Sequence, residues 1–256
     1  MLQIHKIKLA IAFGLASLVF APVQAQPTLN YNKQLNGSLV FNAPPPPSDI
    51  GAPGTRRGGG KRPNCPVVKQ SLIALAPDYS NSNLVMGLTT AEHPTLWFYV
   101  PYQPPYTAKF VLRSADGKSV VYQTDVPLSE KSGVVSFEMP SNAPALEIGK
   151  QYRWYFKIYC GEPQEILAFV DGWVQRVAPK PGLQAQLEQA TPRDRIALYA
   201  TNGIWYEAVT NLAKLRRNSP QDAALATDWA NLLQSIGLAE IAPEPIVDCC
   251  QPKVNN

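Results

Sequence analysis

The pattern of hydrophobic and polar positions divides the chain into a β-rich part and a helical part, with the change near Pro179. From Val67 to Val177, short apolar runs alternate with polar residues and end at turn residues, which is typical of an all-β sandwich. We therefore expect one sandwich domain over residues 65–180. The runs predict strands at 67–75, 84–89, 95–101, 107–114, 119–126, 133–139, 151–160 and 166–177.

The run 151–160 has the clearest alternation, and it predicts which side chains face the core. One face of this strand is almost entirely apolar, whereas the opposite face carries cations and tyrosines. The apolar face holds Tyr152, Trp154, Phe156, Ile158 and Cys160, and the opposite face holds Arg153, Tyr155, Lys157 and Tyr159.

The approach to this strand, Leu146-x-x-Gly149-x-x-Tyr152, resembles the tyrosine corner of immunoglobulin-like and fibronectin-like sandwiches. In that motif a tyrosine hydroxyl bonds to upstream backbone. The resemblance implies their Greek-key topology, in which the strand at 95–101 would pair with the strand at 151–160. Trp97 is placed like the buried tryptophan of those folds, and Phe98 is an equally good candidate for the core.

After Pro179 the apolar positions follow a helical period, which predicts a small helical domain over residues 181–242. The clearest apolar faces lie at 204–217 and 220–236. Part of this region is similar to the middle of a tetratricopeptide repeat, but such repeats need about three copies to bury their faces, so we expect one helical hairpin docked on the sandwich. The helix signals are the starts Thr191-Pro192-Arg193-Asp194 and Ser219-Pro220-Gln221-Asp222 and the stops Gly203 and Gly237.

The ends of the chain read as segments outside the fold. Lys6 and Lys8, an apolar core at 9–20 and the small-residue site Val23-Gln24-Ala25 predict a cleavable signal peptide over residues 1–25. The apolar stretch is shorter than the about 20 residues that a membrane span needs. The mature protein is therefore expected in the periplasm or outside the cell. Residues 26–64, rich in proline and glycine, predict a disordered tether, and residues 243–256 a flexible tail.

Four cysteines remain in the mature chain, and an oxidising compartment makes disulfides their expected state. Cys65 opens the sandwich and Cys160 ends its most apolar strand on the core side, so these two are expected to pair. Cys249 and Cys250 are expected to pair outside the core, either with each other or with another chain, and to have no effect on folding. No C-x-x-C spacing indicates zinc.

The charge and the titratable residues argue against several function classes. Removal of Lys6 and Lys8 leaves 21 basic and 19 acidic residues, a net charge of +2 that does not favour nucleic-acid binding. His93 is the only mature histidine, and no G-x-S-x-G serine accompanies it, so a hydrolase triad is not indicated. Glu162 and Glu165 flank a proline in an expected hairpin loop. The sequence therefore assigns no catalytic, metal-binding or cofactor-binding residue.

The outward aromatic residues are the one suggestive feature. If Leu96, Phe98 and Val100 face the core, then Trp97 and Tyr99 face outward, as Tyr155 and Tyr159 do. Pairing of their strands would join these four in one patch, edged by Arg153 and Lys157. Such a patch could bind sugar rings or a partner protein. Alternatively, the helical domain covers it, because Trp205 and Trp229 need a surface on which to pack.

Several longer segments are together similar to one protein family, namely 91–99, 152–155, 170–174 and 194–208. The chain resembles the uncharacterised domain of unknown function 928, found in exported proteins of cyanobacteria, over about residues 56–242. That family has no assigned activity, so the resemblance implies an exported protein with a two-part layout and adds no catalytic residue.

These observations favour a non-catalytic binding or assembly module of the periplasm or cell envelope. Its partner would be a protein or a polysaccharide, with no cofactor, no nucleic acid and no membrane span once the signal peptide is removed. The alternative is an enzyme with an unrecognised carboxylate-based, hydrolase-like site.

Overall fold

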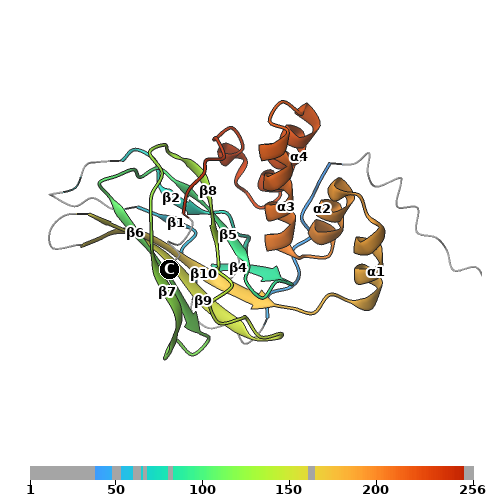
Figure 1. Ribbon diagram of the computed structural model, residues 1–256, viewed down its shortest axis with the longest axis horizontal. Coiled ribbons are helices and arrows are strands. Elements are labelled where there is room, and N and C mark those ends of the chain that lie inside the picture. The colour runs from blue at the N-terminus through green and yellow to red at the C-terminus, as the bar shows by residue number, and fades with distance from the viewer. Residues whose placement is uncertain are drawn as a thin grey trace, which may run out of the picture.

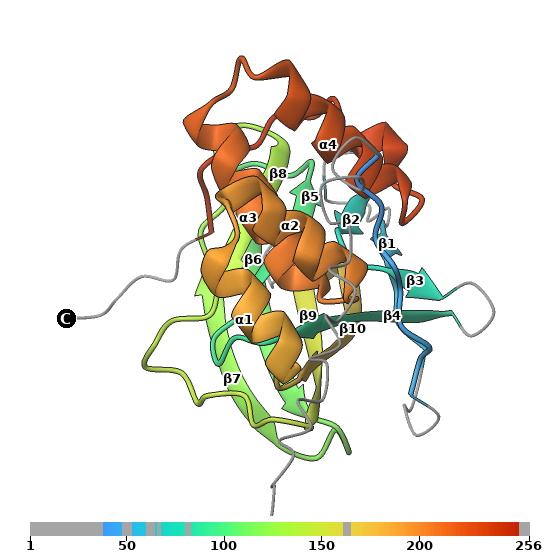
Figure 2. The same cartoon turned by 90° about the vertical axis from the view of Figure 1, so that its right-hand side faces the viewer.

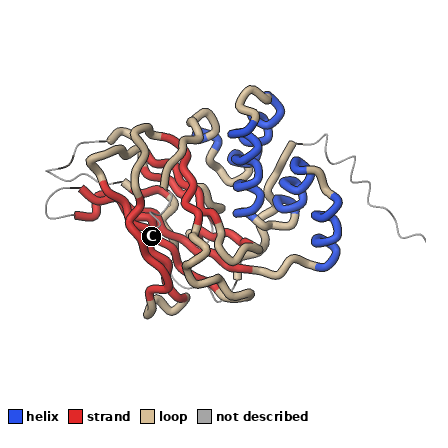
Figure 3. The backbone as a smooth tube through the Cα atoms, in the orientation of Figure 1, coloured by secondary structure: helices blue, strands red, loops and turns tan. Residues whose placement is uncertain are grey.

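The computed structural model describes residues 38–47, 53–59, 65, 68–79, 83–160 and 165–250. These residues form two β-sheets followed by four α-helices, so the fold is mixed β plus α, with the strands before the helices. Figure 3 shows the helices gathered on one side of the strands. The expected signal peptide at 1–25 lies outside the described residues.

The larger sheet has six strands in the order β3-β4-β10-β9-β6-β7 (Figure 1). All neighbours are antiparallel except β4 and β10, which are parallel. Three of the expected strands, at 84–89, 107–114 and 151–160, have the bounds predicted from the sequence. The strands are β3 (Asp78–Tyr79), β4 (Leu84–Thr89), β6 (Thr107–Ser114), β7 (Val120–Val126), β9 (Gln151–Cys160) and β10 (Glu165–Arg176).

The smaller sheet has four antiparallel strands in the order β1-β2-β5-β8. Its inner side packs on the larger sheet through aromatic residues. Phe98 stacks on Phe156 with ring centroids 4.4 Å apart, and Phe110 stacks on Phe137 at 4.1 Å. The core face predicted for the strand at 151–160 is therefore confirmed. The strands are β1 (Arg57–Gly58), β2 (Leu72–Ala74), β5 (Thr95–Val100) and β8 (Gly133–Glu138).

The pairing of β5 differs from the expectation. β5 pairs with β2 and β8, whereas β9 pairs with β6 and β10, so the two strands lie in opposite sheets. The pairing inferred from immunoglobulin-like sandwiches is therefore wrong. The local motif is nevertheless present, because the hydroxyl of Tyr152 accepts a hydrogen bond from the backbone N–H of Glu147 at 3.1 Å. A tyrosine corner determines how the chain enters one strand, but it does not determine which other strands pair with each other.

Four helices follow the sheets, instead of the single hairpin expected. They are α1 (Pro181–Gln189), α2 (Pro192–Thr201), α3 (Trp205–Asn218) and α4 (Ala223–Gln234), followed by a short 3₁₀ helix, η2 (Ala239–Ile241). No helix within the described ranges is long and apolar enough to cross a membrane.

The helix ends match the sequence signals at most positions. The hydroxyl of Thr191 accepts a hydrogen bond from the backbone N–H of Asp194 at 3.3 Å and caps α2. Gly203 and Gly237 follow helices with positive φ angles of 75° and 73°, as expected for helix stops. The start predicted at Ser219 is wrong, because the carboxylate of Asp222 caps α4 instead, accepting from two backbone N–H groups at 2.8 and 3.2 Å.

Helix α3 covers the outer side of the smaller sheet (Figure 2). The indole N–H of Trp97 donates to the hydroxyl of Thr210 at 2.9 Å. The indole N–H of Trp205 donates to the carbonyl oxygen of Leu75 at 2.7 Å, in a fully buried position. One apolar core therefore continues from the sandwich into the helical part.

The expected tether at 26–64 is part of the fold where the structure describes it. Phe41 is 6% exposed and packs edge-on against Trp205, with ring centroids 5.0 Å apart. Thr55 exchanges two backbone hydrogen bonds with Asp171, each 3.0 Å long. The prediction of a tether is therefore wrong for residues 38–47 and 53–59. Backbone hydrogen bonds and the packing of Phe41 hold these extended residues in the fold, although a composition rich in proline and glycine does not predict it.

The expected tail at 243–256 is also packed over its described part, residues 243–250. Val134 in β8 donates its backbone N–H to the carbonyl oxygen of Pro245 at 2.8 Å and accepts from the N–H of Val247 at 2.9 Å. This segment therefore extends the smaller sheet beyond β8 by a short parallel bridge, and the prediction of a flexible tail is wrong for these residues.

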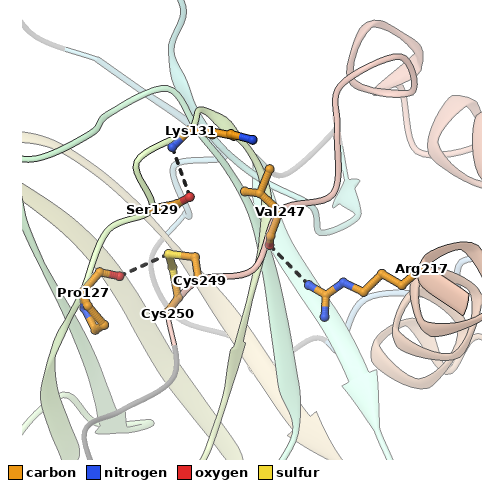
Figure 4. Close-up of a disulfide and its surroundings, with 7 residues drawn as sticks. All are labelled: Pro127, Ser129, Lys131, Arg217, Val247, Cys249 and Cys250. Atoms are coloured by element: carbon orange, nitrogen blue, oxygen red, sulfur yellow. Dashed lines mark hydrogen bonds between the residues drawn. A yellow bond between two sulfur atoms is a disulfide. The ribbon is translucent and has the colours of Figure 1, made fainter.

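Both cysteine pairs are disulfide-bonded. The expected bond between Cys65 and Cys160 is present, with the Cα atoms 6.1 Å apart. Cys249 and Cys250 are bonded to each other, the first of the two alternatives, and Cys249 Sγ lies 3.1 Å from the carbonyl oxygen of Pro127 (Figure 4). Because Cys250 is 2% exposed and belongs to the main core, the expectation that this pair lies outside the core is wrong.

Candidate functional site

The structure divides the six residues of the predicted binding surface into two groups. Trp97 and Tyr99 lie on β5 in the smaller sheet and are 2% and 1% exposed. Helix α3 covers Trp97, and the guanidinium of Arg217 lies 5.6 Å from its ring centroid. Tyr99 bonds to Gln70. Both residues are therefore buried, Trp97 beneath α3. The prediction that they share one patch with Tyr155 and Tyr159 is wrong, because β5 and β9 lie in different sheets.

The other four residues stay together on β9, where the strand alternation directs them away from the core. Their neighbours on β6 and β10 lie on the same side of the sheet, because residues paired across strands share a face. We call this surface the outer face. It comprises Lys109, Val111 and Arg113 on β6, Arg153, Tyr155, Lys157 and Tyr159 on β9, and Phe169, Asp171 and Trp173 on β10.

Two pairs of cations lie directly opposite each other on the outer face. Lys109 is paired with Lys157, and Arg113 is paired with Arg153, in the register of β6 and β9. Like charges in such positions lower the stability of a sheet. Lys109 and Arg113 were absent from the surface predicted by sequence. The alternation of 107–114 directs them outward, but only the pairing of β6 with β9 shows that they lie beside Lys157 and Arg153.

Arg153 is the cation whose charge is neutralised within the fold. Its Nε and Nη2 donate to one oxygen of Asp171, at 2.9 and 2.6 Å. The other oxygen of Asp171 accepts from the backbone N–H of Thr55 at 3.0 Å, and Arg153 Nη2 also donates to the carbonyl oxygen of Pro53 at 2.9 Å. Asp171 is 1% exposed. Arg153 therefore acts as a clamp for the segment at 53–55, which borders the outer face.

The remaining cations are less well compensated. Lys109 Nζ lies 3.5 Å from a carboxylate oxygen of Asp125, whose side chain is 87% exposed. Among the described residues, no carboxylate lies within ion-pair distance of Lys157 or Arg113; Arg113 donates to the carbonyl oxygen of Gly117 at 2.9 Å. Burial, with Arg113 and Lys109 close by, lowers the pKa of Lys157. The outer face therefore carries an excess of positive charge.

Aromatic and apolar groups lie between these cations. Lys157 Nζ and the Arg153 guanidinium lie 5.3 and 5.4 Å from the ring centroid of Tyr155. Tyr159 is partly exposed, and Phe169, which pairs with Lys157, is 41% exposed. The outer face thus combines cations with accessible rings, which suits a ligand that has both negative charge and apolar ring surfaces.

The buried carboxylates are held apart by separate partners. Asp171 binds Arg153, and Asp228 accepts from Arg193 Nε at 2.8 Å. Glu207 Oε1 accepts four hydrogen bonds of 2.7–3.0 Å from Thr89, Thr90 and Ala91, which join α3 to the end of β4. The three carboxylates lie on different elements, and the described residues contain no cluster of His, Cys, Asp and Glu suited to a metal ion.

His93 has a structural partner. Its Nε2 lies 2.8 Å from the carbonyl oxygen of Ala143, in the loop after β8. The ring therefore connects the turn before β5 to this loop, as expected for a turn residue and not for the base of a hydrolase triad.

Comparison with known families shows to which family the chain belongs. The model of the family described as Domain of Unknown Function (DUF928) matches residues 56–246, which is most of the chain. The chain therefore belongs to this uncharacterised family, and the resemblance expected from its motifs is confirmed. No curated protein matches it. The matched range begins at Arg56, beside the clamped segment, and ends at Ile246, in the segment paired with β8.

Proposed function

We propose that this protein is an exported, non-catalytic binding module of the periplasm or cell envelope whose outer face binds an acidic polysaccharide. The opposed pair Lys109 and Lys157, with Arg113 close to Lys157, carries the proposal, because the fourth cation, Arg153, is already neutralised by Asp171. A row of cations that weakens the sheet is explained most simply by an anionic partner that offsets the repulsion when it binds.

The shape and chemistry of the outer face favour a polysaccharide among anionic partners. It is one side of a sheet with aromatic rings between cations, so an extended chain could place its carboxylates on the cations and its sugar rings on Tyr155, Tyr159 and Phe169. A neutral glycan would leave the cations unused. The net charge of the whole chain is small, so binding would depend on this local concentration of charge.

The proposed location rests on the first 25 residues and on the disulfides. The n-region, apolar core and small-residue site at 23–25 have the order of a signal peptide. The Cys65–Cys160 and Cys249–Cys250 bonds are consistent with an oxidising compartment. An acidic polysaccharide is a ligand that a protein would meet in the periplasm, the cell envelope or outside the cell.

Retention on an immobilised acidic polysaccharide tests the proposal. The mature protein is applied to polygalacturonate beads at low ionic strength and eluted with a NaCl gradient. The double variant Lys109→Gln/Lys157→Gln should elute at a clearly lower NaCl concentration, because charge interactions at a surface are screened by salt. The matched control Lys131→Gln/Lys214→Gln removes two exposed cations away from the outer face and should elute like the wild type.

Two results would contradict the proposal. One is equal elution of the two double variants, which would mean that retention reflects net charge alone. The other is no retention of the wild type at low ionic strength. Turnover of the polysaccharide by the wild type would instead favour the alternative enzyme, but the separated carboxylates of the described residues do not support that function.

A further inference from the structure

A pocket of about 290 Å³ lies where three distant segments meet, away from the outer face. The N-terminal segment contributes Phe41, Ala43 and Arg56, and β3 with the preceding residue contributes Pro77, Asp78 and Tyr79. The turn after α4 lines the third side with Ser235, Ile236 and Gly237. This volume lies just below the usual range for ligand sites, about 300–1,000 Å³, and suits only a small molecule.

Arg56 supplies a buried cation to this pocket. Its side chain is 13% exposed, and its Nη1 donates to the carbonyl oxygen of Ile236 at 2.6 Å. Its Nε has almost no accessible surface and, among the described residues, no hydrogen-bond acceptor, so a ligand would not reach it. Its Nη2 makes no hydrogen bond to a described residue and is not enclosed. An oxygen of a ligand carboxylate could therefore bind Nη2.

Asp78 stands beside Arg56 and adds the opposite charge. Its carboxylate oxygen lies 3.6 Å from Arg56 Nε, too far for a hydrogen bond, and its side chain is 30% exposed. A second negative charge on a ligand would be repelled here, whereas an ammonium group would be attracted. The pair therefore offers adjacent sites for a carboxylate and an ammonium.

The rest of the lining is suited to an apolar body. Phe41, Pro77 and Ile236 provide carbon surface, with Phe41 held in place by Trp205. Burial raises the pKa of Tyr79, which also lines the pocket, to about 12. The lining thus combines an apolar wall with one cation and one anion.

We propose that this pocket binds a free α-amino acid with an apolar side chain. The carboxylate would accept hydrogen bonds from Arg56, the ammonium would donate to Asp78, and the side chain would pack on Phe41, Pro77 and Ile236. This site is independent of the outer face. Because it joins the N-terminal segment to α4, the bound amino acid would also stabilise that junction.

Saturation-transfer NMR on the mature protein tests this with L-leucine and L-phenylalanine as probes. Two truncated probes separate the contributions: 4-methylpentanoate lacks the ammonium of leucine, and 3-methylbutylamine lacks its carboxylate. L-Leucine should give a saturable signal, and each truncated probe should bind at least about 10-fold more weakly, as expected for a lost charge-assisted hydrogen bond.

Two variants keep the test independent of Arg56, which also bonds to Ile236 in the turn after α4. Ala43→Phe should fill the pocket and abolish the leucine signal, whereas Ala115→Phe, in an exposed hairpin, should not. Asp78→Asn should weaken leucine binding at least about 10-fold, with Asp116→Asn as its matched control. The inference is overturned if neither amino acid gives a saturable signal, or if leucine binds Ala43→Phe or Asp78→Asn as it binds the wild type.

Discussion

The substitution Gly58→Ala tests whether the N-terminal segment belongs to the fold. Gly58 is the second residue of β1 and passes very close to β10. A Cβ at this position would lie 1.9 Å from the carbonyl oxygen of Phe169 and 2.7 Å from its carbonyl carbon. Ordinary carbon–oxygen contacts are about 3.3–3.6 Å. The obstacle is backbone in the middle of a sheet, so no side-chain rotation can relieve it.

The loss of stability caused by Gly58→Ala can be estimated from the movement of β1 that it requires. To make room, β1 would have to shift by more than an ångström from β10 and disturb the two backbone hydrogen bonds between Thr55 and Asp171. Overpacking typically costs about 1–3 kcal/mol, and each lost hydrogen bond adds about 1 kcal/mol. If one of the two hydrogen bonds is lost, the total cost is about 2–4 kcal/mol. For a protein of this size that lowers Tm by roughly 5–15 °C.

Gly59 provides the matched control one residue away. A Cβ there meets only Ser71 Oγ, at 3.5 Å, which is an ordinary contact. Gly59→Ala should therefore change stability by less than about 0.5 kcal/mol. The assay is thermal unfolding of the two variants followed by circular dichroism. If Gly58→Ala melts within about 2 °C of Gly59→Ala, residues 53–59 are not packed as described, and the expected tether would be right after all.

Two further predictions follow from buried groups at the other interfaces. Trp97→Ala should lose about 3–5 kcal/mol in denaturant unfolding, because it removes a buried indole from beneath α3; Tyr155→Ala, on the outer face, should lose less than about 1 kcal/mol, and equal losses would contradict the assignment of the two faces. Cys249→Ser/Cys250→Ser should lose about 1–3 kcal/mol, because it buries a hydroxyl where Cys250 is 2% exposed; an unchanged unfolding midpoint would restore the view that this pair lies outside the core.

Much of the strand pattern could be predicted, because alternation records which face of a strand is buried. The strand at 151–160 has the predicted bounds and faces, and the Cys65–Cys160 bond follows from its core side. Alternation does not specify which strand lies alongside. Trp97 and Tyr99 were therefore assigned to the wrong neighbours, although their direction, opposite to Phe98, was correct.

The sequence analysis also missed several residues of the outer face and the pocket, because they depend on contacts between segments that are distant in the sequence. Lys109 and Arg113 belong to the outer face only because β6 pairs with β9, which brings together residues 40 or more positions apart. The pocket depends on Arg56 reaching Ile236, in the turn after α4 and 180 residues away in sequence. The segments at 38–47 and 53–59 are held mainly by backbone hydrogen bonds, which leave no periodic hydrophobic pattern.

Lysine footprinting tests the binding role of the outer face most directly. The mature protein is acetylated briefly with and without polygalacturonate, and modification of each lysine is measured by mass spectrometry. Burial, together with Arg113 and Lys109, lowers the pKa of Lys157, which favours its reactive neutral form. Our account predicts that the polysaccharide protects Lys109 and Lys157 several-fold and leaves Lys131 and Lys214 unchanged. Protection of all four to the same extent, or of none, would contradict it.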